Sequence, residues 1–471
     1  MGLFDIVDDM TRFVEETQER VGEVFEPSLR LGVTGLSRAG KTVFIASLVQ
    51  SLMDRGRMKL LSAEADGRIL AAALRPGPDR RTPRFDQEAH MAALLGGEPA
   101  WPESTRSVST LRLSFRLRPS GLLGPFTGPS TLHLDVTDYP GEWLLDLPLM
   151  EQSYAKWSER ALAEAEEPAR APHACEWLAR AKAAAADEAR FEEAAARDLA
   201  EAFKAYLAAC RADGLSGLAP GRFLMPGDLE GSPALAFAPL PPGDRTPLRR
   251  EMEKRYDAYK RAVVLPFFRD HFARLDRQAV LVDLLSAVSA GPRAIEDLQR
   301  AMARILEAFK PGAPSWLAPL LGRRVDRILF AATKADHIHH SQHGRLANLL
   351  RAMLRQASDR AEFRGAKTKA FALAALRATT ETTVRRDGRD LDLVRGRLLS
   401  TGKQAALWPG ELPEDPGALL DPARREDGRW LNGDFGAMAF APPRLSLEAG
   451  DGPPHIRLDR AAQFLIGDRL S

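Results

Sequence analysis

The feature that most constrains this chain is an eight-residue loop between an apolar segment and a helix-like segment. Residues 29–34 (LRLGVT) are β-prone, residues 35–42 read GLSRAGKT, and residues 43–54 have helical apolar spacing. The loop fits the pattern G-x-x-x-x-G-K-[ST] in the strand–loop–helix context that this pattern requires. Its glycines let backbone N–H groups wrap a phosphate, and the helix N-terminus adds a favourable dipole. The sequence therefore predicts a phosphate-binding loop (P-loop).

The residues of this loop have distinct expected roles. We expect Lys41 to place its charge between the β- and γ-phosphates of a nucleotide, and the Thr42 hydroxyl to bind Mg²⁺. A chance match in a glycine-rich chain is the alternative, and the flanking strand and helix argue against it. The other predicted nucleotide-binding residues of the loop and helix start are Gly35, Ser37, Arg38, Ala39, Gly40 and Val43.

A second motif comes after another apolar segment. Residues 131–137 (TLHLDVT) are predicted to form a strand, and Asp138-Tyr139-Pro140-Gly141 comes directly after it. An Asp at the end of such a strand can hold the magnesium shell, and the N–H of Gly141 can reach the γ-phosphate. Asp135 is the rival acid, but no glycine stands three residues after it. We therefore prefer Asp138, with an ordinary strand-to-turn Asp as the alternative.

A third motif indicates which base is bound. Thr333-Lys334-Ala335-Asp336 ends the predicted strand 326–332 and fits [NT]-K-x-D. A carboxylate at Asp336 accepts hydrogen bonds from guanine N1–H and the 2-amino group, a pair of donors that adenine lacks, and the Lys334 stem lies along the purine. The motif narrows the prediction from a nucleotide to a guanine nucleotide. Two further predicted neighbours of the base are His337 and Ala375, the latter within Ala374-Ala375-Leu376.

Together these segments resemble the translation-factor-like and Ras-like P-loop GTPases, and more specifically the bacterial YcjX-like family of P-loop GTP-binding proteins. The closer resemblance lies in GLSRAGKT (35–42), WPESTRS (101–107), DVTDYPGEWLLDLP (135–148) and FAATKADH (330–337). It implies a protein that binds GTP and GDP, is linked to envelope stress responses and is encoded beside a membrane protein. A membrane-protein partner is therefore an expectation from the resemblance alone.

The patterns predict an α/β fold: a P-loop NTPase (GTPase-like) domain with a mainly parallel sheet and a large, mainly α-helical insertion. Ala, Glu, Arg and Lys dominate residues 161–212 of the insertion, and these residues favour helices. Residues 65–100 and 377–440 are expected to be loop-rich, the former with short helices. We divide the chain into an N-terminal amphipathic helix (1–28), a first part of the P-loop domain (29–150), the insertion (151–277), and a second part with C-terminal elements (278–471).

A threonine that contacts the γ-phosphate and Mg²⁺ is expected between the first helix and the strand that begins near residue 108. We choose Thr105 over Thr82, which lies far upstream in a Pro/Arg-rich loop. With Thr42 and Asp138, Thr105 completes the predicted metal-binding set. Further predicted neighbours of the nucleotide in this segment are Trp101, Ser104 and Arg106.

Two departures from Ras-like enzymes bear on catalysis. Glu142 stands where those enzymes carry a glutamine that orients the attacking water, and an ionised carboxylate cannot donate a hydrogen bond. Arg38 lies on the P-loop, where guanylate-binding proteins and atlastins have a similar arginine that acts in cis, a charge worth roughly 10³–10⁵ in rate. A solvent-facing Arg38 is the alternative. The predicted catalytic residues are Arg38, Lys41, Thr105 and Glu142.

These observations predict a protein that hydrolyses GTP to GDP with Mg²⁺ and acts as a switch or mechanical element. The alternative is a nucleotide-gated scaffold with little turnover, which Glu142 favours and Arg38 disfavours. A P-loop ATPase or small-molecule kinase is the less favoured prediction, because T-K-A-D argues against ATP.

Charge and hydropathy limit the other function classes. The chain has 66 Lys and Arg residues and 64 Asp and Glu residues, which gives a net charge of +2. The protein therefore has no strong overall positive charge that would favour binding to nucleic acid. The N-terminus lacks the basic flank of a secretory signal, and we find no apolar run of about 18 residues for a membrane span. We expect a cytoplasmic protein, and leave open a peripheral inner-membrane location and a homodimer.

Residues 1–25 are expected to pack on the domain, because their acidic face would be repelled by anionic lipid.

A histidine cluster comes after the T-K-A-D motif and has two interpretations. His337, His339, His340 and His343 lie close together, with His339 and His343 four residues apart. A zinc site needs a third ligand, and none is evident nearby in the sequence. We therefore interpret the cluster as a loop and helix start, with metal binding as the alternative.

Overall fold

The computed structural model describes residues 26–36, 38–77, 79, 81–103, 107–119, 128–186, 191–307, 325–363, 365–386, 389–421 and 435–471. The predicted helix at 1–25 lies outside the described residues. So do four predicted site residues, Ser37, Ser104, Thr105 and Arg106.

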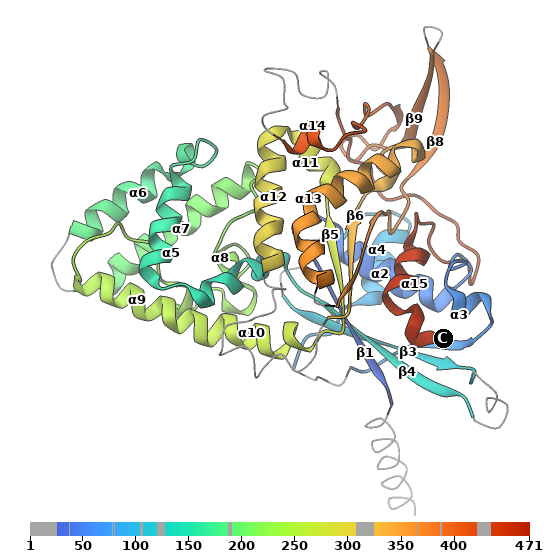
Figure 1. Ribbon diagram of the computed structural model, residues 1–471, viewed down its shortest axis with the longest axis horizontal. Coiled ribbons are helices and arrows are strands. Elements are labelled where there is room, and N and C mark those ends of the chain that lie inside the picture. The colour runs from blue at the N-terminus through green and yellow to red at the C-terminus, as the bar shows by residue number, and fades with distance from the viewer. Residues whose placement is uncertain are drawn as a thin grey trace, which may run out of the picture.

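The centre of the molecule is a seven-stranded sheet with the order β2-β3-β4-β1-β5-β6-β7 (Figure 1). The five strands from β4 to β7 in that order run parallel, whereas β3 is antiparallel to β4, and β2 to β3. This confirms the predicted α/β class with a mainly parallel sheet. The strands are β1 (Ser28–Gly35), β2 (Ile69–Arg75), β3 (Ser109–Leu117), β4 (Ser130–Asp138), β5 (Arg277–Val282), β6 (Arg327–Ala332) and β7 (Lys367–Ala372).

Helices cover both faces of the sheet, which is why its central strands are apolar along most of their length. One face packs in a hydrophobic core with α2, α3, α4 and α15, and the other with α11, α12, α13 and the helices of the insertion. The covering helices are α2 (Lys41–Asp54), α3 (Ser62–Ala65), α4 (Gln87–Leu95), α11 (Leu284–Ala290), α12 (Pro292–Glu307), α13 (His343–Phe363) and α15 (Leu458–Leu470).

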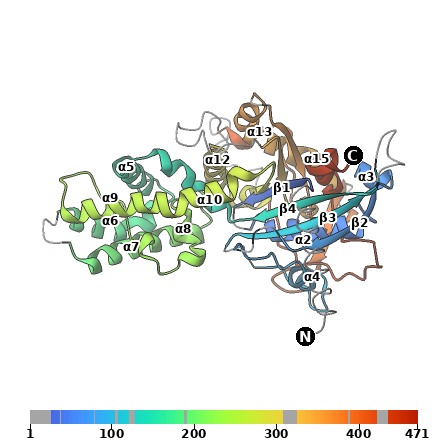
Figure 2. The same ribbon diagram turned by 90° about the horizontal axis from the view of Figure 1, so that it is seen from below.

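The chain between β4 and β5 is helical and forms a lobe beside the sheet, from which α9 and α10 lead back to it (Figures 1 and 2). Aromatic side chains fill its centre: Trp157 stacks on Tyr256 at 5.0 Å, and Trp177 on Tyr206 at 5.1 Å. The elements are η2 (Gly141–Glu151), α5 (Tyr154–Ala165), α6 (Ala171–Ala186), α7 (Glu193–Ala212), α8 (Gly221–Leu224), η3 (Gly227–Leu229), η4 (Pro233–Leu235), α9 (Pro247–Tyr259), the π-helical turn η5 (Lys260–Val264), α10 (Leu265–Asp270) and η6 (Phe272–Arg274).

Two segments expected to be loop-rich contain strands. β2 lies within 65–100, and residues 377–440 contain a second, antiparallel sheet with the order β10-β9-β8, as well as the short helix α14 (Gly417–Leu420). The second sheet consists of β8 (Thr379–Arg386), β9 (Arg389–Arg397) and β10 (Gln404–Leu407). Most residues of its strands are exposed or half-buried, and β8 and β9 are rich in Thr, Arg and Asp. These strands therefore lack the apolar run by which a buried strand is recognised.

Among the described residues, no helix combines the length and the apolar character that crossing a membrane requires.

Candidate functional site

The predicted motifs meet at one edge of the sheet, because each comes after the carboxyl end of a parallel strand. The P-loop sequence begins at the last residue of β1, D-Y-P-G begins at the last residue of β4, and T-K-A-D follows β6. β1 lies between β4 and β5 at the centre of the sheet. Ligands of open α/β sheets bind at this edge, outside the strand ends at the centre of the sheet.

The P-loop curves tightly between β1 and α2. Arg38 and Gly40 both have left-handed backbones, with φ of 66° and 83°, and the N–H of Ala39 donates to the Leu36 carbonyl at 3.1 Å. Gly40 is the N-cap of α2 and supplies no capping side chain. The first N–H groups of a helix have no partner within the helix, so such an end is suited to hold an anion.

Lys41 is buried in this loop instead of extending into solvent. Its side chain is 7% exposed, and Nζ donates to the carbonyl of Gly35 at 2.8 Å. This bond uses one of the three donors of the ammonium group. Thr42 is the next residue in the first turn of α2 and is also buried. Two polar side chains are therefore fixed at the helix start, and Val43 beside them is partly exposed.

The D-Y-P-G segment packs directly against the start of the P-loop. A Cβ atom placed on Gly141 would lie 2.5 Å from the carbonyl oxygen of Gly35 and 3.1 Å from the nitrogen of Leu36. Only a glycine therefore allows this approach. Asp138 is the last residue of β4, is 3% exposed and stands opposite Val33 of β1.

The rival acid Asp135 has a different position. It pairs with Arg112 of the neighbouring strand β3 through two hydrogen bonds of 2.7 and 2.9 Å. This ion pair lies within the strands and not at their carboxyl ends. Asp135 therefore stabilises the pairing of β3 with β4, whereas Asp138 is the acid at the carboxyl ends of the parallel strands.

The T-K-A-D segment is held against the loop after β7. The N–H of Ala335 donates to the carbonyl of Leu373 at 3.1 Å, and the N–H of Ala378 donates to the Asp336 carboxylate at 2.8 Å. The Thr379 hydroxyl donates to the backbone carbonyl of Asp336. These bonds fix the Asp336 side chain and bring the loop that carries Ala375 beside it.

Lys334 and His337 have partners that the motif does not reveal. The Lys334 ammonium pairs with Asp283, whose carboxylate also caps α11 by accepting from the N–H of Ser286 at 3.2 Å. His337 is buried, and this burial lowers the pKa of its imidazole. Its ring lies 5.1 Å from the ring of Phe440, whose carbonyl accepts a hydrogen bond from Trp101 Nε1 at 2.7 Å. Through these two contacts, Phe440 places Trp101 near the T-K-A-D segment.

The two residues that differ from the pattern of Ras-like enzymes also differ in exposure: Arg38 is exposed and Glu142 is buried. Glu142 lies beneath α8 of the helical lobe, where a Cβ on Gly221 would collide with the Glu142 carbonyl. The residue directly after D-Y-P-G is therefore covered by the insertion. Gly221 was not identified from the sequence, since nothing in its local pattern marks a contact with a segment so far upstream.

A buried carboxylate joins the same two segments. Asp146 of η2 accepts hydrogen bonds from the N–H of Gly221 and the hydroxyl of Tyr259, each at 2.6 Å, and from the N–H of Arg222 at 3.3 Å. Burial raises the pKa of Asp146 to about 6, against the lowering effect of these bonds.

Trp143, also in η2, adds two contacts to the same junction. Its Nε1 donates to the Met225 carbonyl at 2.9 Å, and the Arg222 guanidinium lies 3.1 Å above its ring. The segment after the second motif is thus bound to the insertion by hydrogen bonds, a cation–π contact and close backbone packing.

Comparison with known proteins agrees with these features. Residues 29–470 match the YcjX-like family, DUF463. The chain is 37% identical over 482 residues to the Escherichia coli (strain K12) protein named Ras-like GTPase YcjX, covering 98% of this chain and 100% of that relative. It is 36% identical over 500 residues to the Shewanella oneidensis MR-1 protein of the same name, covering 100% of both. This chain, with its P-loop sequence after β1 of a mainly parallel sheet, belongs to the YcjX-like family.

Proposed function

We propose that the protein binds guanine nucleotides and hydrolyses GTP to GDP with Mg²⁺, acting as a switch or mechanical element. The observation that carries this proposal is the meeting of three motifs at one sheet edge. Gly141 packs on Gly35 of the P-loop, and the Asp336 carboxylate is fixed by the loop after β7. The name that the two relatives share, Ras-like GTPase, supports the same activity.

The residues at the edge fit a magnesium ion. Thr42 and Asp138 offer a hydroxyl and a carboxylate, both buried, and Mg²⁺ prefers such oxygen ligands. Thr105, which lies outside the described residues, would complete the set. When bound, the ion would neutralise charge on the phosphates. Lys41 would add a fixed positive charge, because its amine is already held at the strand end by the Gly35 carbonyl.

Guanine selectivity would come from the orientation of Asp336. The N–H of Ala378 holds one oxygen of the carboxylate, so the group does not need to be ordered when a base binds. An ionised carboxylate is an acceptor only, which suits the N1–H and 2-amino donors of guanine and leaves adenine without a match. Lys334, anchored to Asp283, would lie along the purine.

Arg38 would supply the positive charge that stabilises the transition state, because it stands exposed on the P-loop itself.

A specific observation also favours a second candidate function. Glu142 is 5% exposed, packs under Gly221, and as a carboxylate cannot donate to an attacking water. A scaffold that binds GTP and GDP with little turnover, and signals through the helical lobe, is therefore the alternative.

The setting of this function is a further part of the proposal. From the family resemblance we propose a role in envelope stress and a membrane-protein partner. From the sequence itself we propose a cytoplasmic location, to which a peripheral position at the inner membrane and a homodimer are added as separate proposals.

The test compares GTP with ATP in binding titrations and single-turnover hydrolysis with Mg²⁺. We expect GTP to bind and turn over, and Asp336→Asn to weaken GTP binding by roughly 100-fold, because two hydrogen bonds to a charged group are lost. Asp359→Asn, on the exposed surface of α13, is the matched control. Tight GTP binding without turnover would favour the scaffold. Equal affinity for ATP would overturn the assignment of Asp336.

A further inference from the structure

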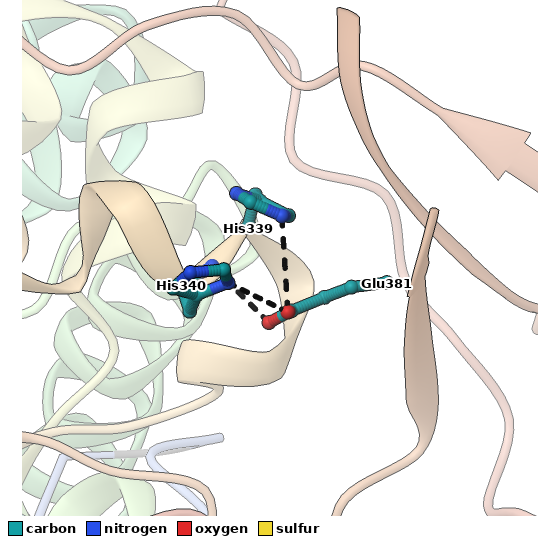
Figure 3. A group of neighbouring side chains, drawn as sticks. All are labelled: His339, His340 and Glu381. Atoms are coloured by element: carbon teal, nitrogen blue, oxygen red, sulfur yellow. Dashed lines mark hydrogen bonds and ion pairs between the residues drawn. The ribbon is translucent and has the colours of Figure 1, made fainter. Parts of the chain in front are cut away.

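Two histidines and a glutamate come together outside the nucleotide site (Figure 3). His339 and His340 lie at the start of η8 (His340–Gln342), just after the T-K-A-D motif, and Glu381 lies on β8. Glu381 Oε2 is 3.8 Å from His339 Nε2 and 2.7 Å from His340 Nδ1. One nitrogen or oxygen atom from each residue lies within 4.8 Å of the other two. Such convergence of imidazole and carboxylate groups is what a transition-metal ion requires.

The second nitrogen of His339 is held by another carboxylate. Nδ1 lies 3.1 Å from Asp392 Oδ2 on β9 and 2.9 Å from the Ser341 hydroxyl. Nδ1 also accepts from the N–H of Ser341 at 3.4 Å, and the Ser341 hydroxyl donates to Asp392 at 3.4 Å. These contacts hold the ring so that Nε2 is the nitrogen that faces Glu381. Carboxylates beside metal-binding histidines orient the ring in a similar way. His339 is 7% exposed, so the surrounding residues also restrain the ring.

The third residue is suited to bind a cation. The Glu381 carboxylate faces both imidazoles, and its side chain is 24% exposed. Carboxylate oxygens are among the ligands that zinc accepts beside histidine nitrogens. The side chain of His340 is 67% exposed, which leaves a path for an ion and room for water ligands.

We propose that His339 Nε2, His340 Nδ1 and the Glu381 carboxylate bind one divalent transition-metal ion, with Zn²⁺ the best match, and that Asp392 positions His339. Tetrahedral zinc with bonds of about 2.0–2.2 Å places its ligand atoms roughly 3.3 Å apart. The observed separations from Glu381, 2.7 and 3.8 Å, lie on either side of that value. The ion would replace the proton between His340 and Glu381. The third ligand that the sequence does not reveal beside the histidines is thus supplied by a distant strand.

The site would fasten the second sheet to the base-recognition segment. Glu381 stands just after Ala378 and Thr379, which bind the carboxylate and the backbone carbonyl of Asp336. The two histidines stand just after Asp336 on the other side of the same contact. An ion between them would close a ring of contacts around Asp336, in addition to the hydrogen bonds already present.

The test is a competition titration of the full chain with Zn²⁺ against a chromophoric chelator, in buffer with Mg²⁺ and without nucleotide. We expect one zinc per chain. Glu381→Gln and His339→Ala should each weaken binding at least 10-fold, and Asp392→Asn should weaken it roughly 10-fold. His173→Ala is the matched control, because His173 also pairs with a carboxylate, Asp213 at 2.6 Å, on the helical lobe.

Two readouts keep the result independent of folding defects. Circular dichroism checks that each variant is folded, and Co²⁺ in place of Zn²⁺ reports tetrahedral ligands by its visible absorption, which should be present in wild type and His173→Ala and absent in Glu381→Gln. Absence of stoichiometric zinc binding by the wild type, or zinc affinity equal in wild type and Glu381→Gln, would overturn the proposal. Neither measurement depends on GTP binding or hydrolysis.

Discussion

Arg38 has a backbone conformation that glycine adopts more readily than arginine. Its φ of 66° lies in the left-handed region, and its side chain is exposed at the P-loop. Together with its place on the P-loop, this unfavourable backbone conformation makes Arg38 a candidate for a catalytic role. We expect Arg38→Ala to slow single-turnover GTP hydrolysis by roughly 10³-fold or more, with GTP affinity changed only a few-fold. Arg38→Gly relieves the backbone and should be equally slow. An unchanged rate in both variants would exclude catalysis by Arg38.

Asp146 makes a pH-dependent contribution to stability. Its pKa of about 6 in the folded protein exceeds the ordinary 3.8, because burial disfavours the charge. The folded state therefore retains a proton that the unfolded state releases as the pH rises from about 4 to about 6. Over this window the contribution of Asp146 to the free energy of unfolding should fall by about 3 kcal/mol. Above it, the loss remains constant.

Urea unfolding of wild type and Asp146→Asn at several pH values isolates this effect. The free energy of unfolding of the wild type, minus that of the variant, should decrease between pH 4 and pH 6. Asp297, another carboxyl whose pKa burial raises, is present in both proteins, so its contribution cancels. A difference that stays flat across the window would mean that Asp146 titrates at its ordinary pKa.

At the scale of elements, the sequence predicts the motifs at the ends of three buried strands. It does not predict the segments of the chain that pack against those motifs. The apolar runs identify β1, β4 and β6, and the motifs after them share an edge because parallel strands end together. The contact of Gly221 with Glu142 joins elements far apart in the chain and leaves no periodic signal. Glu381, the third residue of the proposed zinc site, was not predicted from the sequence for a related reason: β8 is a partly exposed strand without an apolar run.

The junction between η2 and α8 depends on a glycine. In Gly221→Ala, the added methyl group would collide with the Glu142 carbonyl, so the two elements must separate. We expect the free energy of unfolding to fall by about 1–3 kcal/mol. Gly344→Ala is the control, since a Cβ there meets no atom within 4 Å and the residue lies in α13. That change should be neutral or stabilising by about 0.4–1 kcal/mol. Equal effects in the two variants would show that the junction is loosely packed.

At the scale of the whole molecule, the helical lobe and the sheet share one hydrophobic core. A single cluster of buried side chains includes Leu36 of the P-loop, Tyr139 and Trp143 after β4, and Trp157 and Phe203 in the lobe. Close-packed interiors transmit displacement because they have little free space. A shift of Gly141 at the P-loop should therefore reach the lobe through η2, where Asp146 and Trp143 bind α8 and the residues beside it.

Because the lobe and the sheet share this core, we expect the bound nucleotide to change the dynamics of the lobe. We expect amide hydrogen exchange of residues 221–270 to differ between the complexes with GDP and with a non-hydrolysable GTP analogue. The reason is that, in the proposed nucleotide site, the γ-phosphate would contact the segment that begins at Gly141. Asp146→Asn should reduce that difference while leaving affinity for the analogue within a few-fold, since Asp146 binds the lobe and not the P-loop. Peptides from α15, on the opposite face of the sheet, serve as the internal control. If exchange in the lobe is identical in both complexes of the wild type, the insertion does not respond to nucleotide, and its output must be sought elsewhere on the sheet edge.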